Sequence, residues 1–144
     1  MIRIYRLVIY LILSSTIAAQ SITIKSPKKG ESWIVGEIYD ISWKADNISG
    51  KIVIEYKDGY ESEWVQFKEV TLGEGNVSFY VQKIKDDFLY IRIKSLEATS
   101  LSHETRIKIM DCAGTPNGSA YEDECGTCDN NPSNDCEKDC QGVW

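Results

Sequence analysis

The sequence predicts an all-β fold, a β-sandwich followed by an irregular disulfide-rich tail, on three observations. Between Ser21 and Met110, apolar residues alternate with polar ones, which is the period of a strand with one buried face. All five cysteines follow that region, and so does the densest block of acidic residues. The first part can therefore fold by burying apolar surface, whereas the second has few apolar residues and needs cross-links, metal or both.

Residues 1–19 have the three-part order of a secretory signal peptide. Two arginines precede an unbroken apolar run from Leu7 to Leu13, and small and polar residues follow up to Ala19. The run is too short to cross a bilayer, which takes roughly 20 apolar residues. We therefore expect cleavage after Ala19 and a secreted or cell-surface chain with no membrane span. An uncleaved anchor over residues 2–17 is the alternative.

Seven short strands are expected in the first domain, residues 20–110. They cover residues 22–25, 39–44, 51–56, 64–69, 76–82, 88–95 and 105–110. Turn sequences such as Lys57-Asp58-Gly59 and Lys85-Asp86-Asp87 separate them. Seven strands in about 90 residues match the size and rhythm of an immunoglobulin-like antiparallel sandwich.

A motif of turn and aromatic residues opens this domain. Pro27 and Gly30 suit a tight turn, Gly36 suits a bend, and Trp33 and Trp43 are large enough to fill the space between two sheets. The stretch reads P-x-x-G-x-x-W-x-x-G-x-x-x-x-I-x-W. It resembles the opening of the Ig-like, Ser/Thr-rich cell-surface domain at the N-terminus of fungal cell-wall β-glucan synthesis proteins.

This resemblance covers residues 22–110 and implies an extracellular sandwich with no catalytic residue. The chain lacks the long Ser/Thr-rich stalk of the fungal members, so a role in a fungal wall is not transferred to it.

Four aromatic residues fall in loops or on the solvent-facing side of the expected strands. They are Tyr60, Trp64, Tyr80 and Tyr90. Flat rings in such places can stack on a sugar or a protein partner, and ordinary cross-strand packing is the alternative. Three Asn-x-Ser triplets, at Asn47, Asn76 and Asn117, match the acceptor pattern for N-glycosylation.

The tail, residues 111–144, is expected to be held by disulfides. In a secreted chain Cys112, Cys125, Cys128 and Cys136 favour two bridges, and three connectivities remain open. A zinc site of four thiolates, formed by Cys125, Cys128, Cys136 and Cys140, is a weaker alternative, because oxidising compartments disfavour free thiolates.

A repeat begins a second time near the end of the chain. Asp111-Cys112-Ala113-Gly114 recurs as Asp139-Cys140-Gln141-Gly142, so one period of 28 residues is complete and the next has just begun. We expect Cys140 to be an unpaired or intermolecular thiol, and the chain to be a fragment of a longer protein.

Calcium is the metal that the tail favours. Asp129, Asn131, Ser133 and Asp135 are spaced two residues apart, as are oxygen ligands in a loop that wraps a hard cation. The glycine and the bidentate glutamate of an EF-hand loop are missing. The stretch instead resembles thrombospondin type 3 repeats, which implies calcium bound with little regular structure. A solvated spacer without metal is the alternative.

Composition argues against two classes of function. The chain has a single histidine, His103, and no motif of a hydrolase elbow, a zinc helix or a phosphate-binding loop, so we do not expect an enzyme. Once Arg3 and Arg6 leave with the signal peptide, 14 bases face 22 acids, which disfavours nucleic acid as a partner.

The sequence therefore predicts a secreted, non-enzymatic module that is adhesive or glycan-associated. Its partner would be an extracellular polysaccharide or a surface protein. The alternative is an accessory, glycan-binding module of a larger secreted enzyme whose catalytic domain follows residue 144.

Overall fold

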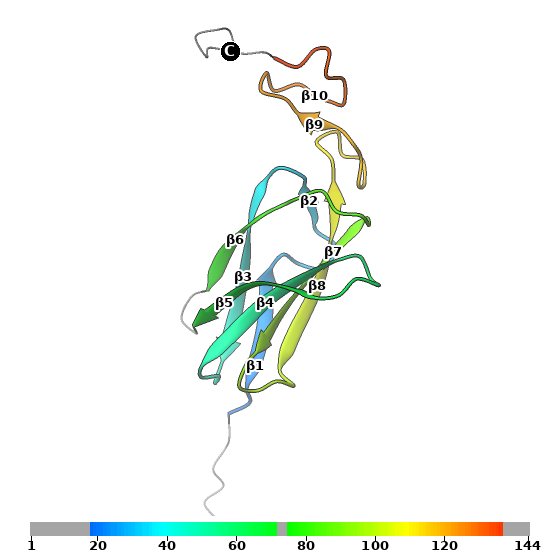
Figure 1. Ribbon diagram of the computed structural model, residues 1–144. Helices are drawn as coiled ribbons and strands as arrows, with labels where there is room; N and C mark the ends of the chain where they lie inside the picture. The colour runs from blue at the N-terminus through cyan, green and yellow to red at the C-terminus, as the bar shows by residue number, and fades with distance from the viewer. Residues whose placement is uncertain (1–17, 72–74, 137–144) are drawn as a thin grey trace, which may run out of the picture.

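The computed structural model describes residues 18–71 and 75–136, and within these residues the chain is all-β, with no helix. Eight strands form the sandwich and two short ones lie in the tail (Figure 1). The strands are β1 (Ser21–Ser26), β2 (Ser32–Ile34), β3 (Ile38–Asp46), β4 (Lys51–Asp58), β5 (Val65–Thr71), β6 (Asn76–Tyr80), β7 (Phe88–Ser95), β8 (Ser102–Met110), β9 (Tyr121–Glu122) and β10 (Cys128–Asp129).

Two sheets make the sandwich. One has the strand order β1-β3-β6 and the other β2-β8-β7-β4-β5, an immunoglobulin-like arrangement that confirms the predicted fold class. Every pair is antiparallel except β2 with β8, which is parallel. The turn at Pro27–Gly30 explains this exception, because it moves the chain from the sheet of β1 to the sheet of β8.

Alternating burial along the strands builds the core. In β3 the side chains of Ile41 and Trp43 are buried, and in β1 those of Ile22 and Ile24. Trp33 is 2% exposed and stacks on the ring of Tyr39 with the centroids 4.8 Å apart. The prediction that Trp33 and Trp43 fill the sandwich is therefore confirmed.

The outer face of the larger sheet departs from simple alternation. Val53 and Glu55 lie on the side of β4 opposite to the core residues Ile52 and Ile54, yet they are only 1% and 7% exposed. Long polar side chains from neighbouring strands cover this face, so the expectation of one dry and one wet face holds only in part.

Two disulfides hold the tail. Cys112 pairs with Cys128 and Cys125 with Cys136, with Cα–Cα distances of 5.8 and 5.7 Å. The pairing selects one of the three connectivities that the sequence left open, and its two loops overlap in sequence because Cys125 lies inside the first loop. The second copy of the repeat, with Cys140, lies outside the described residues.

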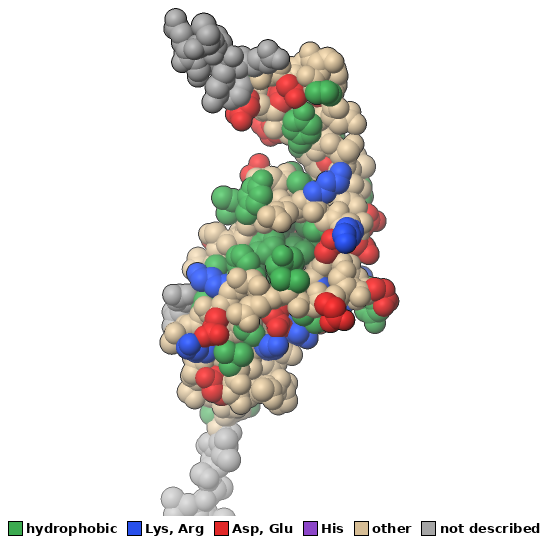
Figure 2. All heavy atoms as spheres, viewed as in Figure 1, with side chains coloured by type: hydrophobic (Ala, Val, Ile, Leu, Met, Phe, Trp, Pro, Cys, Tyr) green, Lys and Arg blue, Asp and Glu red, His purple; other side chains and the backbone are tan. Residues whose placement is uncertain are grey.

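The two ends of the chain leave the sandwich at opposite ends (Figure 1). Most of the expected signal peptide lies outside the described residues, which begin at Ala18. Nowhere in residues 18–71 and 75–136 is there a helix long and apolar enough to cross a membrane. Figure 2 shows apolar side chains gathered at the centre of the visible face of the sandwich, with acidic side chains in the tail above it.

Candidate functional site

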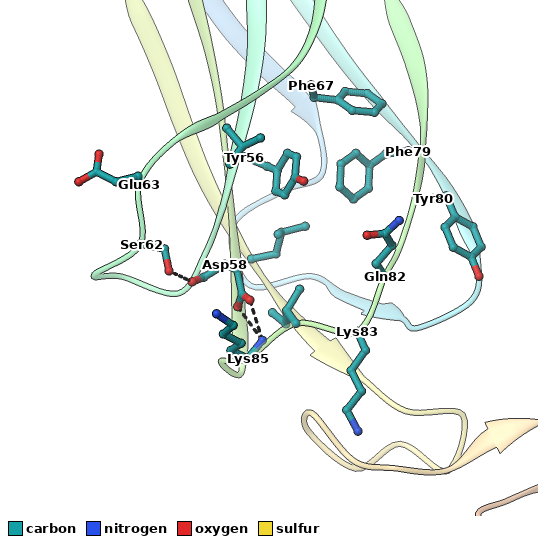
Figure 3. Close-up of a pocket in the computed structure, with 13 residues that line it drawn as sticks. Tyr56, Asp58, Ser62, Glu63, Phe67, Phe79, Tyr80, Gln82, Lys83 and Lys85 are labelled. Atoms are coloured by element: carbon teal, nitrogen blue, oxygen red, sulfur yellow. Dashed lines mark hydrogen bonds between the residues drawn. The ribbon is translucent and has the colours of Figure 1, made fainter.

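A cleft opens between the two sheets where their edge strands β5 and β6 diverge (Figure 3). It has a volume of about 420 Å³. The inner wall is aromatic: the ring of Phe79 contacts the rings of Phe67 and Tyr56 edge-on, with centroid distances of 4.9 and 5.6 Å. Tyr80, one of the four predicted stacking residues, lines this cleft and is 54% exposed.

The rim of the cleft is fixed by Asp58 at the end of β4. Its carboxylate accepts the backbone N–H groups of Lys85 and Asp86, at 2.7–2.8 and 3.1 Å, and its carbonyl accepts the hydroxyl of Ser62 (Figure 3). These bonds tie the loop after β4 to the segment before β7. The loop that carries Tyr60 is therefore held at both of its ends.

A second depression, which we call the basic depression, lies on the outer face of the larger sheet. Its volume is about 390 Å³, and the residues that line it are Lys29, Tyr60, Tyr90, Glu104, Thr105 and Arg106. Tyr60 and Tyr90 come from a loop and from β7, and their rings meet edge-on with centroids 6.3 Å apart. Two of the predicted stacking residues thus share one site, together with two cations that the sequence did not single out.

Cations pack against the aromatic rings at this site. The Nζ of Lys57 lies 5.0 Å from the ring centres of both Tyr60 and Tyr90 and 5.2 Å from that of Trp64. The guanidinium of Arg92 lies 4.1 Å from the centre of Trp64. Such contacts stabilise the cluster, and each cation occupies one face of the ring that it contacts.

Exposure separates the roles of these rings. Tyr90 is 9% exposed and offers little surface to a ligand, which favours packing, the alternative that the sequence left open for it. Trp64 is partly exposed, and one face of its ring is already in contact with the guanidinium of Arg92. Tyr60 is 70% exposed. The hydrogen bond from the Nζ of Lys57 to the Tyr60 carbonyl, 2.6 Å long, fixes the backbone that carries this ring.

A paired carboxylate anchors the same face. Glu55 accepts hydrogen bonds from Arg92 at 2.6 and 2.8 Å and forms an ion pair with Lys94 at 2.7 Å. Burial alone would raise the pKa of Glu55, but the hydrogen bonds and charges of Lys94 and Arg92 outweigh it and hold the pKa below its ordinary value. This carboxyl is committed to structure and is not free to act as an acid or base.

The tail joins the sandwich through a buried carboxylate. Asp111 is 3% exposed, and it accepts the N–H of Thr115 at 2.7 Å and that of Ala120 at 3.2 Å. The N–H of Asn117 donates to the carbonyl of Ile109 in β8. The first ten residues of the tail are therefore hydrogen-bonded to one another and to the last strand of the sandwich.

The same turn occurs twice in the tail, in Asp111-Cys112-Ala113-Gly114-Thr115 and in Asp123-Glu124-Cys125-Gly126-Thr127. In each, the aspartate N–H donates to the threonine carbonyl at 2.9 Å, and the aspartate Oδ1 accepts the threonine N–H at 2.7 or 2.8 Å. The glycines have φ angles of 79° and 78°. Sequence reasoning compared Asp111 with Asp139 and missed the D-x-x-G-T pattern shared with Asp123.

The four predicted calcium ligands, Asp129, Asn131, Ser133 and Asp135, lie along one segment, and two of them accept backbone N–H groups of that segment. Asp129 accepts the N–H of Asn131 at 2.8 Å, and the amide oxygen of Asn131 accepts the N–H of Ser133 at 3.2 Å. Asp135 instead accepts the hydroxyl of Tyr121 at 2.6 Å. Within the described residues, no three His, Cys, Asp or Glu side chains are grouped so as to hold a metal ion.

Acidic side chains of the tail nevertheless act together on the pKa of Tyr121. Its hydrogen bond to Asp135 raises the pKa of the Tyr121 hydroxyl, and the charges of Asp135, Asp129 and Asp123 raise it further. One oxygen each of Asp123 and Asp135 is enclosed and has no hydrogen-bond partner among the described residues. These two oxygens were not distinguished by the sequence.

The predicted glycosylation sites differ in accessibility. Asn47 and Asn76 are exposed, whereas the amide of Asn117 donates to the carbonyl of Lys85 within the junction with the tail.

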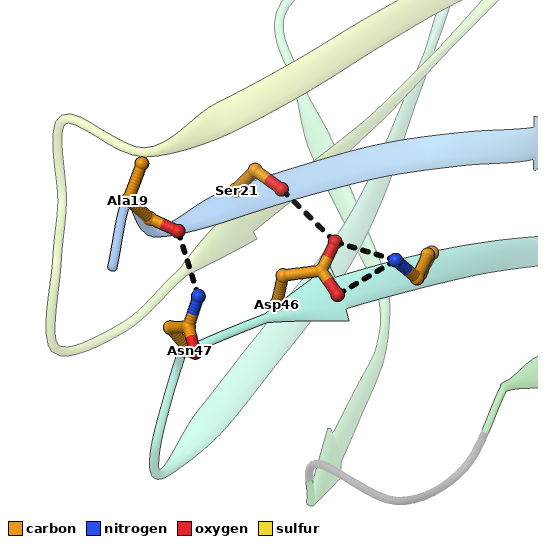
Figure 4. A network of polar contacts seen from close by, with 5 residues as sticks. Ala19, Ser21, Asp46 and Asn47 are labelled. Atoms are coloured by element: carbon orange, nitrogen blue, oxygen red, sulfur yellow. Dashed lines mark hydrogen bonds and ion pairs between the residues drawn. The ribbon is translucent and has the colours of Figure 1, made fainter.

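The residues next to the expected cleavage position are hydrogen-bonded to the end of β3. Asn47 donates to the carbonyl of Ala19 at 2.9 Å, beside the bond from Ser21 to Asp46 (Figure 4). The expected cleavage position therefore lies directly before β1.

The single histidine has a structural contact. His103 accepts the backbone N–H of Ile24 through Nδ1 at 3.3 Å, which links β8 to β1 across the two sheets.

The chain matches no protein-family model, and none of the curated proteins matches it.

Proposed function

We propose that the chain is a secreted, non-enzymatic module that binds an extracellular polysaccharide and is carried on a disulfide-bonded stalk. The observation that carries the proposal is the exposure of Tyr60. This residue is 70% exposed, although hydrogen bonds fix the loop that carries it. An exposed aromatic side chain forgoes the free energy of burial, at about 25 cal/mol per Å². An exposed ring on a fixed loop is suited to stacking on the apolar face of a sugar, with little cost for ordering the backbone on binding.

The stalk part of the proposal is supported by the hydrogen bonds of Asp111 at the junction and by the two disulfides, whose loops overlap in sequence. Because the chain enters and leaves the sandwich at opposite ends, the tail carries the polypeptide away from the end at which β1 begins (Figure 1). The same geometry suits an accessory, glycan-binding module of a larger secreted enzyme. In both cases the sandwich contributes binding and not catalysis.

Affinity electrophoresis tests the binding part. The oxidised, secreted chain is run through gels that contain neutral or acidic polysaccharides, next to the Tyr60→Ala variant and a Tyr80→Ala control from the inter-sheet cleft. We expect retardation of the parent chain and of Tyr80→Ala, and its loss in Tyr60→Ala. Retardation that is lost only in Tyr80→Ala would move the site to the cleft, and no retardation in any gel would contradict the proposal.

Calcium binding by the tail forms a second candidate function. The observation that favours it is the pair of enclosed, unpartnered oxygens of Asp123 and Asp135. A buried carboxylate oxygen without a donor is costly, and a cation would relieve that cost. We therefore add Asp123 as a candidate ligand to the four that were predicted from the sequence.

Calorimetric titration of the chelator-stripped chain tests this second candidate. We expect a dissociation constant of about 10⁻⁴–10⁻³ M, the range of extracellular calcium modules, with the affinity lost in Asp123→Asn and Asp135→Asn but kept in Glu124→Gln. The pKa of Tyr121 should fall on binding, because calcium would draw the charge of Asp135 away from its hydroxyl. No heat and an unchanged Tyr121 titration would leave the tail as a metal-free spacer.

A further inference from the structure

We propose that the basic depression binds an anionic sugar, a pyranose that bears a carboxylate or a sulfate. This inference rests on the proposed polysaccharide binding and specifies its ligand. The ring would stack on Tyr60, and its acidic group would accept hydrogen bonds from Lys29 and Arg106, which line the same depression.

Free positive charge is the first reason. Lys29 and Arg106 form no ion pair within the described residues, and Glu104 is the one carboxylate that lines the depression. Next to it, Arg92 and Lys94 share the single carboxylate of Glu55. An ionised ligand group placed here would gain charge-assisted hydrogen bonds, which are about twice as strong as neutral ones.

The charge stands out against the rest of the chain. Residues 20–110 hold 13 bases and 14 acids, and the tail holds one base and eight acids. A depression with two unpaired cations and one acid is therefore a local exception on an acidic protein. Non-specific attraction of polyanions is weak for such a chain, so binding depends on contacts at this place.

Fixed positions of the two cations are the second reason. The guanidinium of Arg106 lies 4.9 Å from the ring centre of Phe88, which orients it on β8. The N–H of Gly30 donates to the carbonyl of Arg106 at 3.1 Å, and this bond holds the turn that carries Lys29 against the same strand. Both donors thus lie on backbone that is fixed before a ligand arrives.

The remaining groups suit a sugar better than an acidic peptide. Glu104 can accept hydrogen bonds from the hydroxyl groups of a sugar ring, which an acidic peptide side chain does not offer. The edge-on contact with Tyr90 and the Lys57 ammonium support Tyr60 from the side of the sheet. The depression therefore combines a ring platform, two cationic donors and one acceptor.

The test compares two matched ligands by calorimetry with the oxidised, secreted chain. One is a galacturonic acid oligomer, and the other is the same oligomer after reduction of its carboxyl groups. The variants are Tyr60→Ala, Arg106→Gln and Lys29→Gln, with Lys25→Gln on the other sheet as a control of equal charge change. A polyglutamate peptide of the same net charge serves as the competing ligand.

We expect the acidic oligomer to bind at least tenfold more tightly than the reduced one. Arg106→Gln and Lys29→Gln should remove most of that difference, Tyr60→Ala should weaken both oligomers, and Lys25→Gln should change neither. Equal affinity for the two oligomers would overturn the anionic specificity and leave polysaccharide binding intact. Binding of polyglutamate as tightly as the acidic oligomer would overturn the sugar class, and binding of no ligand at all would contradict both.

Discussion

The carboxylate of Asp111 lies directly against the backbone of Gly118. A Cβ atom at Gly118 would stand 1.9 Å from Oδ2 of Asp111, a separation that no side chain can adopt. The close approach lets the buried carboxylate reach the N–H groups of Thr115 and Ala120 at once. The joint between sandwich and tail therefore depends on the absence of a side chain at one position.

Gly118→Ala should loosen this joint while the sandwich stays folded. The added methyl group must displace the Asp111 carboxylate, and hydrogen bonds to a charged acceptor contribute about 1.5–3 kcal/mol. We expect amide hydrogen exchange at Thr115 and Ala120 to lose about 2 kcal/mol of protection. Gly75→Ala is the control, since no atom of the described residues lies within 4 Å of the added methyl group there. Unchanged protection in Gly118→Ala would show that the joint does not depend on this contact.

Alternation in the sequence predicted most of the fold, because it reports directly on which face of a strand is buried. Residues 88–95 were predicted as a strand, and β7 has those bounds. The strand β2 was not among the seven predicted, since three residues are too few to show a period. The burial of Glu55 was also missed, because it depends on Arg92 and Lys94, which lie far along the chain and come next to it only through strand pairing.

The disulfide pairing can be checked by peptide mapping of the unreduced chain. We expect one cross-linked pair that joins Cys112 to Cys128 and another that joins Cys125 to Cys136. Reduction should release the tail, because closing a loop of about 15 residues contributes about 3 kcal/mol. The sandwich should keep its own unfolding transition, since its core contains no cysteine. A Cys112–Cys125 peptide, or loss of the sandwich on reduction, would contradict this prediction.

The ion pairs of Glu55 should make stability depend on pH at the acid end. Its folded pKa lies below the ordinary value of 4.5, so its contribution is complete above that value and is lost as the pH falls through the folded pKa. Glu55→Gln should cost about 1–2 kcal/mol at pH 7, less than a fully buried pair because Arg92 and Lys94 are partly exposed.

Urea unfolding at several pH values measures that effect. The difference in unfolding free energy between the parent chain and Glu55→Gln should shrink towards low pH, whereas the exposed Glu61→Gln should follow the parent throughout. A difference that stays constant from pH 7 to pH 2 would mean that the ion pairs do not carry the effect.

The candidate site could be predicted only in part from the sequence. Tyr60 was singled out because it is an aromatic residue expected in a loop, where its ring can present a flat face, and this reasoning needs no contacts. Lys29 and Arg106 were not, because they are 77 residues apart and meet only through the bond from Gly30 to β8. For Tyr90 the sequence left both stacking and packing open, since its position on the outer face does not reveal that the residue is only 9% exposed.

The most direct test of ligand binding at Tyr60 is an NMR titration of the isotope-labelled, oxidised chain with the galacturonic acid oligomer. Binding at the basic depression should give saturable shifts at Tyr60 and at the amides around Lys29 and Arg106, with Val65, Phe67 and Tyr80 unchanged. Shifts confined to those last three residues would place binding in the inter-sheet cleft. That outcome, or a spectrum that does not change at millimolar ligand, would contradict the central claim that Tyr60 presents a binding surface.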